Sequence, residues 1–474
     1  MGLLRRFVIA HEKYLIYYLL TIYSVIAGFT IYWFNGTGDD GDSITHYLFA
    51  KYAPSHPALY FDHWAKPLFV LLASPFAQFG FNGMKIFNAL VVFISILLTY
   101  RTAVALQLKN ALATVAIMIC APLYYVLTFS GLTEPLFGCF IIAGILLLAK
   151  DKKNAAAVII SFLPFIRSEG LIIAGVFGLY FLLNNNWKSL LLLAVGSVIY
   201  SIAGWFVYHD VLWVFNKIPY ATLSSVYGKG ELFNFIYKLI YITGVPVYIL
   251  FWAGAIAGMI KSFKNPFKID VKKLILLSCF AFIVGHSIFW YFGIFNSMGL
   301  IRVLVGIMPL LALIALEGFN LITEIKMPGR YSRSIIQFLV LSYIVAFPFT
   351  PNHAALHFQK DMTLNKRQIA ALSAATFIKE NTGLSNRFLF NYHYLAEVLG
   401  IDYFDPHFRI DLNSTNIEEM KSGDIIILQS GFGSGDQDHE QYKPDKIKNL
   451  RCIYLDVQEN NGIILKSSVY KKVN

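Results

Sequence analysis

The sequence predicts a polytopic α-helical membrane protein with about 11 transmembrane helices and a C-terminal extracytoplasmic α/β domain. Of its 474 residues, 57% are hydrophobic and only 14% are charged, whereas soluble proteins carry about 25% charged residues. The mean hydropathy is +0.58. Only four cysteines occur, three of them in apolar runs. This composition excludes a soluble single domain, a disordered chain and a disulfide-stapled secreted protein.

Apolar runs that could form membrane helices recur along the first 350 residues. They lie at about 14–34, 84–106, 110–129, 135–149, 155–166, 170–183, 189–208, 238–260, 274–295, 303–323 and 334–350. The first run is too long for a signal peptide and lacks a small-x-small cleavage site, so we expect a retained helix. Arg5, Arg6 and Lys13 precede it, which places the N-terminus inside. An odd number of spans then places residues 351–474 outside.

The net charge of +11 belongs to the membrane part. Residues 1–350 hold 25 Lys/Arg and 13 Asp/Glu, while residues 351–474 hold 14 and 15. Basic residues gather in the loops that the alternation places inside, such as Lys150–Lys153 and Lys261–Lys273. The charge therefore reports membrane topology, and we expect membrane lipids rather than nucleic acid as partners. We expect an integral protein of a bacterial inner (cytoplasmic) membrane.

Residues 351–474 are predicted to form the soluble α/β domain. A helix is expected near Thr363–Glu380. Strand-like runs follow at Arg387–Tyr392, Asp424–Gln429, Arg451–Val457 and Ile463–Val469.

The first outer loop, about 35–83, carries three carboxylates within four residues: Asp39, Asp40 and Asp42. Carboxylates this close repel each other unless a cation lies nearby. Such a cluster suits a general base or a divalent metal. The alternative is a solvated turn in which Asp42 or Ser43 caps the following helix.

The same loop continues through His56, His63 and Lys66 among aromatic residues. It then enters the apolar segment Leu68–Phe79, which is too short to span comfortably and is expected to lie in the interface. Lys66 and the two histidines could bind an anionic head group. The alternative is an aromatic interface belt with a snorkelling lysine.

Three later outer ends also carry charges: Glu134, the pair Arg167 and Glu169, and Arg302. Taken singly, Glu134 could mark a helix start, Arg167 and Glu169 could form an internal ion pair, and Arg302 could anchor a helix at the interface. Ionisable groups near membrane depth are usually functional. Because all of these residues fall on one side of the membrane, we expect them to meet in one pocket with the first outer loop.

In layout the chain resembles the GT-C glycosyltransferases, polytopic enzymes that use polyprenyl-phosphate-linked sugars and include protein O-mannosyltransferases and lipid A aminoarabinose transferases. The resemblance rests on Asp39-Asp40-Gly41-Asp42, Thr133-Glu134-Pro135, Phe165-Ile166-Arg167-Ser168-Glu169-Gly170, Arg302–Pro309 and the soluble outer domain. It implies a catalytic base in the first loop, at Asp40 or Asp42. It also implies contacts to the donor phosphate and the acceptor at the other positions. The cluster differs from the Asp-Glu pair of the O-mannosyltransferases, which leaves the subfamily open.

The expected reaction is transfer of a sugar to an acceptor hydroxyl on the outer face, with inversion at the anomeric carbon. Nucleotide sugars are not available there, so a polyprenyl-phosphate donor is expected. The acceptor could be a lipid, a glycan or a protein. No cofactor is certain, and a divalent metal at the acidic cluster is possible. The alternative functions are a lipid or glycan transporter, a polysaccharide polymerase or ligase, and a sensor.

Overall fold

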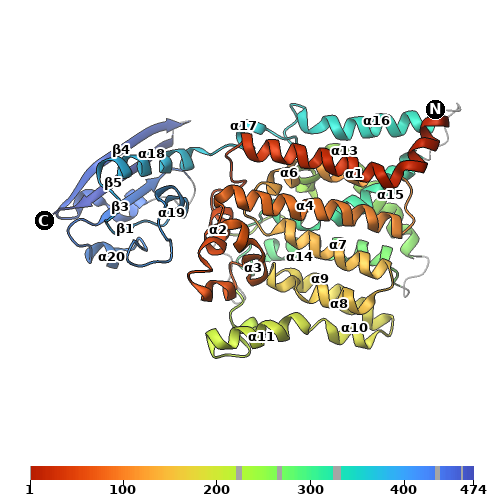
Figure 1. The fold of residues 1–474 in the computed structure, drawn as a ribbon, viewed down its shortest axis with the longest axis horizontal. Coiled ribbons are helices and arrows are strands. Elements are labelled where there is room, and N and C mark those ends of the chain that lie inside the picture. Colours follow the sequence, from red (N-terminus) through yellow and green to blue (C-terminus); the bar gives the residue numbers. More distant parts are fainter. Residues whose placement is uncertain are drawn as a thin grey trace.

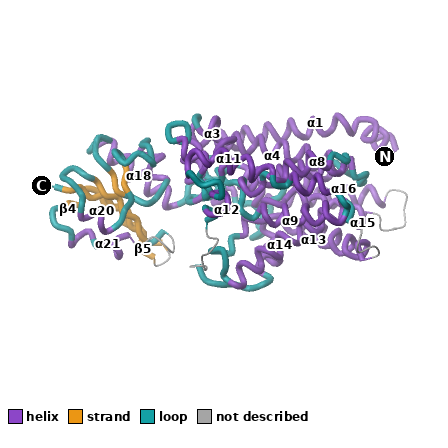
Figure 2. The backbone as a smooth tube through the Cα atoms, turned by 90° about the horizontal axis from the view of Figure 1, so that it is seen from below, coloured by secondary structure: helices purple, strands orange, loops and turns teal. Residues whose placement is uncertain are grey.

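The computed structural model describes residues 2–219, 227–263, 269–323, 332–432, 438–460 and 463–473. A helical bundle makes up most of the molecule, and a smaller α/β domain lies at one end of it (Figure 1). The N-terminus lies at the end of the bundle remote from this domain, and the C-terminus lies within the domain (Figures 1 and 2). The two parts match the membrane region and the tail expected from the sequence.

Every apolar run expected from the sequence is helical among the described residues. The longer bundle helices are α1 (Gly2–Trp33), α4 (Gly80–Ala105), α7 (Glu134–Ala149), α9 (Gly170–Leu183), α11 (Val195–Tyr208), α13 (Asn234–Phe263), α14 (Val271–Phe292), α15 (Met308–Thr323) and α16 (Ser332–Ala346). The shorter ones are α5 (Ala113–Ile119), α6 (Pro122–Thr128), α8 (Lys153–Ser161), α10 (Trp187–Leu192) and α12 (Trp213–Asn216). The 3₁₀ turns are η2 (Leu163–Phe165), η3 (Ile301–Ile307) and η4 (Phe347–Phe349).

Six helical segments of the described chain are long and apolar enough to cross a membrane. They are Tyr14–Trp33, Gly80–Ala105, Trp187–Tyr208, Asn234–Phe263, Val271–Phe292 and Ile301–Ile322. Large apolar side chains remain exposed on the bundle, among them Tyr18, Val25 and Phe206 at 68%, 67% and 72%. Such a surface suits lipid rather than water. The predicted class, a polytopic helical membrane protein with a C-terminal α/β domain, is confirmed.

Several predicted helices are interrupted, as where 155–166 divides into α8 and η2 and 189–208 into α10 and α11. The run expected at 110–129 is divided into α5 and α6 around Cys120 and Ala121, with Pro122 as the first residue of α6. Proline suits a helix start because it has no N–H to leave unpaired. Helix α13 bends at Gly244, whose φ of 73° is left-handed, two residues before Pro246.

The first outer loop folds into α2 (Asp42–Tyr52), η1 (Pro57–Phe61) and α3 (Pro67–Ala77). Helix α3 packs against α2 and α4 and buries Phe69, Val70 and Ala73. Its other side leaves Leu71 and Leu72 exposed. The expected short apolar helix is therefore present, with one face in the core and one face outside it.

The C-terminal domain is a five-stranded mixed sheet with helices. Its strands are β1 (Phe388–Leu389), β2 (Arg409–Ile410), β3 (Ile425–Ser430), β4 (Leu450–Asn460) and β5 (Ile463–Lys472), in the order β2-β1-β3-β5-β4. Its helices are α17 (Phe358–Asp361), α18 (Lys366–Asn381), α19 (Tyr394–Leu399), α20 (Ser414–Glu418), α21 (Asp438–Tyr442) and the turn η5 (Pro444–Lys446). Strand β1 is parallel to β2 and β3, whereas β5 is antiparallel to β3 and β4.

The C-terminal domain is fastened to the first outer loop by polar contacts. Glu397 of α19 accepts hydrogen bonds from Lys51 (2.7 Å) and Tyr47 (2.9 Å), both on α2. His56 lies 2.8 Å from the carboxylate of Asp402. The helix that begins with Asp42 is therefore held against the soluble domain from its middle to its C-terminal end.

Candidate active site

The acidic loop after α1 is a compact turn organised by Asp39. One carboxylate oxygen of Asp39 accepts hydrogen bonds from the backbone N–H groups of Gly41 (2.9 Å) and Ser43 (3.3 Å). The Ser43 hydroxyl in turn accepts from the N–H of Gly131 at 2.7 Å. A Cβ on Gly131 would lie 2.3 Å from the Ser43 carbonyl oxygen, so only glycine permits this approach. The loop is thereby fixed beside the start of α7.

Arg302 neutralises this acidic loop. Its guanidinium donates to the second carboxylate oxygen of Asp39 and to one oxygen of Asp42. Its Nε lies 3.8 Å from Oε1 of Glu134. The Arg302 side chain is only 14% exposed, whereas that of Asp42 is 44% exposed. Arg302 thus joins two segments that are 260 residues apart in the chain.

Close packing of two glycines explains why Arg302 and Glu134 are neighbours. A Cβ on Gly138 of α7 would lie 3.0 Å from the Gly306 carbonyl oxygen of η3. Glu134 and Arg302 each stand four residues before these glycines, at the same end of their elements. The small residues let the two backbones approach, as in many membrane helix pairs, and bring both charged side chains to one place.

A second ion cluster centres on Arg167 in the loop between η2 and α9. Its guanidinium lies 2.8 Å from Glu134 and 2.9 Å from Glu169, and it donates to the Thr133 hydroxyl at 3.0 Å. The alternative of a simple helix start at Glu134 gains no support from Thr133, whose side chain makes no capping hydrogen bond. Burial, the largest single effect, would raise the pKa of Glu169, but attraction to Arg167, His286 and Lys66 acts together with a backbone hydrogen bond to lower it to about 2. Glu134, 1% exposed, links both arginines.

Lys66 approaches this cluster from the first outer loop. Its ammonium group donates to the Ser168 hydroxyl (2.9 Å) and to the His63 carbonyl oxygen (3.0 Å). Its φ of 71° is left-handed, which is uncommon for a residue with a side chain and often marks a functional position. Burial lowers the pKa of Lys66 to about 8. Lys66 therefore adds a third cation beside Arg167.

The two predicted histidines have other partners. His56 pairs with Asp402 of the C-terminal domain. His63 is buried, with its Nε2 at 3.0 Å from the Val214 carbonyl oxygen. The imidazoles of His56 and His63 therefore make no described hydrogen bond with the ion cluster. The other predicted site residues with described contacts do come together: Asp39, Asp42, Glu134, Arg167, Glu169, Arg302 and Lys66.

Asp40 differs from its acidic neighbours. It is partly buried, and no hydrogen bond or ion pair of its side chain occurs among the described residues. Asp42 also keeps one carboxylate oxygen without a hydrogen bond there. These are the two acids of the loop that could accept a proton from a bound molecule, and only Asp42 contacts a cation of the cluster.

The sequence did not single out two further residues near the site. His286 of α14 lies 4.0 Å from Glu169 and is buried; an ionisable residue within an apolar run was the available signal. His393, at the start of α19, stacks on Tyr403 and lies within electrostatic reach of Asp42. Burial and Arg409 lower the pKa of His393 to about 4, with Asp42 acting in the opposite direction. No sequence signal links His393 to the first loop.

The acidic cluster is not arranged as a metal site. No group of three or more His, Cys, Asp or Glu side chains with metal-ligand geometry occurs in the part of the chain that the structure describes. Asp39 and Asp42 instead bind one guanidinium. The divalent metal considered from the sequence stays a prediction, and the reaction proposed for this site uses side chains alone.

Comparison with solved structures shows which known proteins share this fold. No protein-family model and no curated protein matches the sequence. The structure of ArnT from Cupriavidus metallidurans bound to undecaprenyl phosphate superposes with a TM-score of 0.63 at 12% identity, covering 97% of this chain and 98% of ArnT. ArnT is a lipid A aminoarabinose transferase of the GT-C superfamily. The chain has the GT-C fold.

A second GT-C protein is also similar. The Archaeoglobus fulgidus oligosaccharyltransferase, in its apo form and in complex with Zn and sulfate, matches with a TM-score of 0.50 at 12% identity. These matches cover 84% and 82% of this chain but 64% and 62% of the oligosaccharyltransferase. The resemblance predicted from the sequence is confirmed for the fold. On this GT-C fold, the ion cluster lies where the bundle meets the C-terminal domain.

Proposed function

We propose that this chain is a membrane glycosyltransferase that moves a sugar from a polyprenyl-phosphate donor to an acceptor hydroxyl. The observation that carries the proposal is a cluster of three cations at the end of the bundle that carries the soluble domain: Arg302 binds Asp42, Arg167 pairs with Glu134, which also lies beside Arg302, and Lys66 donates to Ser168, the residue after Arg167. Arginine and lysine are the side chains that bind phosphate best. The ArnT structure with its bound undecaprenyl phosphate supports a lipid-linked donor for the same fold.

The reaction is a single displacement. The acceptor oxygen forms a bond to the anomeric carbon as the bond from that carbon to the phosphate oxygen breaks. The bonding electron pair leaves with the polyprenyl phosphate, and the acceptor proton moves to a carboxylate. Attack from the face opposite the leaving group inverts the anomeric configuration. Arg302, Arg167 and Lys66 stabilise the departing phosphate.

We assign the general base to Asp42. A base must lie beside the reacting carbon, and that carbon is bonded to the donor phosphate oxygen. Asp42 is the acid that is both hydrogen-bonded to Arg302 and substantially exposed, at 44%. Asp39 has both carboxylate oxygens engaged and positions Arg302. Asp40 makes no contact with a described cation and serves as the matched comparison.

We place the chain in the inner membrane of a bacterium, with the N-terminus inside and the C-terminal domain outside. The lysine-rich ends of the helices, including Lys150–Lys153 and Lys188, then face the cytoplasm. The ion cluster faces the outer side, where a lipid-linked donor is the available form of activated sugar. A cysteine introduced in the sheet domain should react with an impermeant maleimide in intact cells.

The function is tested by incubating the purified full chain with polyprenyl-phosphate sugars and extracts of membrane lipid, glycan and protein. The expected product is an acceptor heavier by one sugar residue, formed together with free polyprenyl phosphate. Movement of unchanged donor across a vesicle membrane would instead indicate a transporter. A product heavier by a block of sugars would indicate a polymerase or ligase.

The lowered pKa of Lys66 predicts how donor binding depends on pH. Because the pKa of Lys66 is lowered to about 8, its ammonium is protonated below that pH and loses its charge above it. The KM for the donor should therefore rise by roughly tenfold or more as the pH passes from 7 to 9, since a charge-assisted phosphate contact is lost. Lys66→Met should have a high donor KM that varies little over this range. A donor KM independent of pH in the unmodified protein would remove Lys66 from the phosphate site.

A further inference from the structure

A mainly apolar cavity with charged residues at its mouth lies at the end of the bundle opposite the ion cluster. It has a volume of about 190 Å³ and is enclosed by α13, α14, α15 and the segment that follows α4. Arg302 stands at the start of η3, whereas Glu317, fifteen residues on, lines the cavity. Along a 3₁₀ turn and an α-helix this separation is about 25 Å, close to the ~30 Å hydrocarbon thickness of a bilayer. The cavity and the candidate active site therefore face opposite leaflets.

The walls of this cavity, called here the α13–α15 cavity, are mainly apolar. They include Leu106, Leu108, Leu276, Leu313, Ile314 and Leu321. The cavity begins where two helices separate: a Cβ on Gly254 would lie 2.0 Å from the Ile314 carbonyl oxygen, so α13 and α15 are in backbone contact there. Leu321 remains 39% exposed. The walls could accommodate part of an acyl chain.

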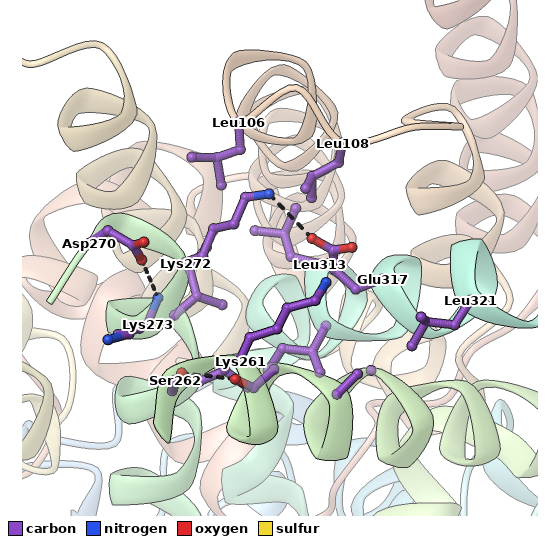
Figure 3. A pocket seen from close by; sticks show the side chains of 16 residues that line it. Leu106, Leu108, Lys261, Ser262, Asp270, Lys272, Lys273, Leu313, Glu317 and Leu321 are labelled. Carbon is purple, nitrogen blue, oxygen red and sulfur yellow. Dashed lines mark hydrogen bonds and ion pairs between the residues drawn. The ribbon is translucent and has the colours of Figure 1, made fainter. Parts of the chain in front are cut away.

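Two lysines and one glutamate meet in the cavity. Figure 3 shows the side chains of Lys261 and Lys272 directed toward Glu317 from different helices. Lys272 Nζ lies 3.5 Å from Glu317 Oε1, a long ion pair. Lys261 forms no ion pair among the described residues. Only one of the two lysines is thus paired with the carboxylate, which leaves an excess positive charge beside an apolar wall.

The other polar groups of the cavity have partners within their own helices. The Ser262 hydroxyl donates to the Gly258 carbonyl oxygen at 2.8 Å. Asp270 caps α14 by accepting from the Lys273 N–H at 2.9 Å. In Figure 3 the side chain of Lys273 extends away from Glu317. One carboxylate oxygen of Asp270 therefore holds the end of α14, and no ion pair between Asp270 and Lys261 occurs among the described residues.

We propose that the α13–α15 cavity binds an anionic phospholipid of the leaflet opposite the candidate active site. The lipid phosphate lies between Lys261 and Lys272, and part of an acyl chain packs against the leucine-rich wall. Basic hollows between membrane helices are suited to anionic head groups, and zwitterionic lipids lack the net negative charge that Lys261 attracts. The site is separate from the sugar-donor site and requires no donor or acceptor.

In the test, phosphatidylglycerol is titrated into the purified full chain in detergent, with no sugar donor present. The rise in the melting temperature of the protein with lipid concentration gives the affinity. Phosphatidylcholine and glycerol phosphate are titrated in parallel. Phosphatidylglycerol should stabilise the chain at far lower concentration than either. Lys261→Gln combined with Lys272→Gln should weaken this binding roughly 30-fold, the effect of two lysines near a phosphate.

A matched control removes the same charge from the same end of the bundle. Lys152→Gln with Lys188→Gln alters a separate, shallower hollow and should leave phosphatidylglycerol binding unchanged. Glu317→Gln should tighten binding, because it removes the carboxylate that competes with the phosphate for Lys272. If the Lys272–Glu317 ion pair only stabilises the fold, Glu317→Gln should instead lower the melting temperature and leave phosphatidylglycerol binding no tighter.

Three outcomes would overturn the proposal. Equal stabilisation by phosphatidylcholine would show no charge selectivity. Equal stabilisation by glycerol phosphate would show an anion site without a lipid chain. Equal losses in the two double variants would show a diffuse charge effect. Each result leaves the transfer assay unaffected, so the two proposals fail separately.

Discussion

Asp42→Asn is expected to reduce kcat for sugar transfer roughly 100- to 10,000-fold, the usual contribution of a general base. The amide keeps the size of the side chain but cannot take the acceptor proton. The donor KM should change much less, because Arg302 retains Asp39 as a partner and stays in place. Initial rates of product formation, measured on the folded and monodisperse variant, give both constants.

Asp40→Asn is the control for this experiment. It removes the same charge from the same loop, at a residue without a described ion pair, and should retain most of the activity. A strong loss in Asp40→Asn with an active Asp42→Asn would move the base to Asp40. Near-normal transfer in both variants would remove the loop carboxylates from the chemical step.

Glu134→Gln is expected to produce the largest loss of stability. The Glu134 side chain is 1% exposed and lies 2.8 Å from Arg167. Removing one member of a buried ion pair costs up to about 3–5 kcal/mol, and the cost here is reduced because Arg167 keeps Glu169 and Arg302 keeps Asp39 and Asp42. The melting temperature of the purified protein should fall by several degrees, and transfer should fall with it because Arg167 and Arg302 lose their common partner.

A double replacement separates folding from function at this site. Glu134→Leu with Arg167→Met removes both charges, and apolar pairs often restore the stability lost by breaking a buried ion pair. We expect a melting temperature above that of Glu134→Gln, with transfer still lost. Asp151→Asn, which alters an exposed pair with Lys153, should change neither property. Recovery of transfer in the double replacement would show that the cluster only supports the fold.

The membrane fold could be predicted because apolar runs report burial in lipid directly. The interruptions do not show in the hydrophobicity: the division at Cys120 precedes Pro122 and the bend at Gly244 precedes Pro246, within runs that are apolar throughout. In the C-terminal domain, strand β2 has only two residues, Arg409 and Ile410. Its pairing with β1 is a tertiary contact that leaves no periodic pattern in the sequence.

The candidate site could be predicted as a set of residues on one side of the membrane but not as a set of contacts. Sidedness indicated that Asp42, Glu134, Arg167 and Arg302 would lie near one another. It could not indicate that Arg302 binds the acidic loop while Arg167 binds Glu134. His56 was expected at the donor, yet its described partner is Asp402, 346 residues further along the chain. Which of several nearby charged side chains a residue pairs with depends on three-dimensional geometry, and the order of residues in the sequence does not contain it.

The attachment of the soluble domain to α2 has a consequence for how variants of the outer region should be interpreted. Asp42 is the first residue of α2, and Tyr47 and Lys51 on the same helix are hydrogen-bonded to Glu397. The sheet domain therefore acts as a buttress for the helix that carries the proposed base. Damage far from the membrane, in α19 or the strands behind it, would tilt that helix and slow turnover without any change in the groups that meet the sugar.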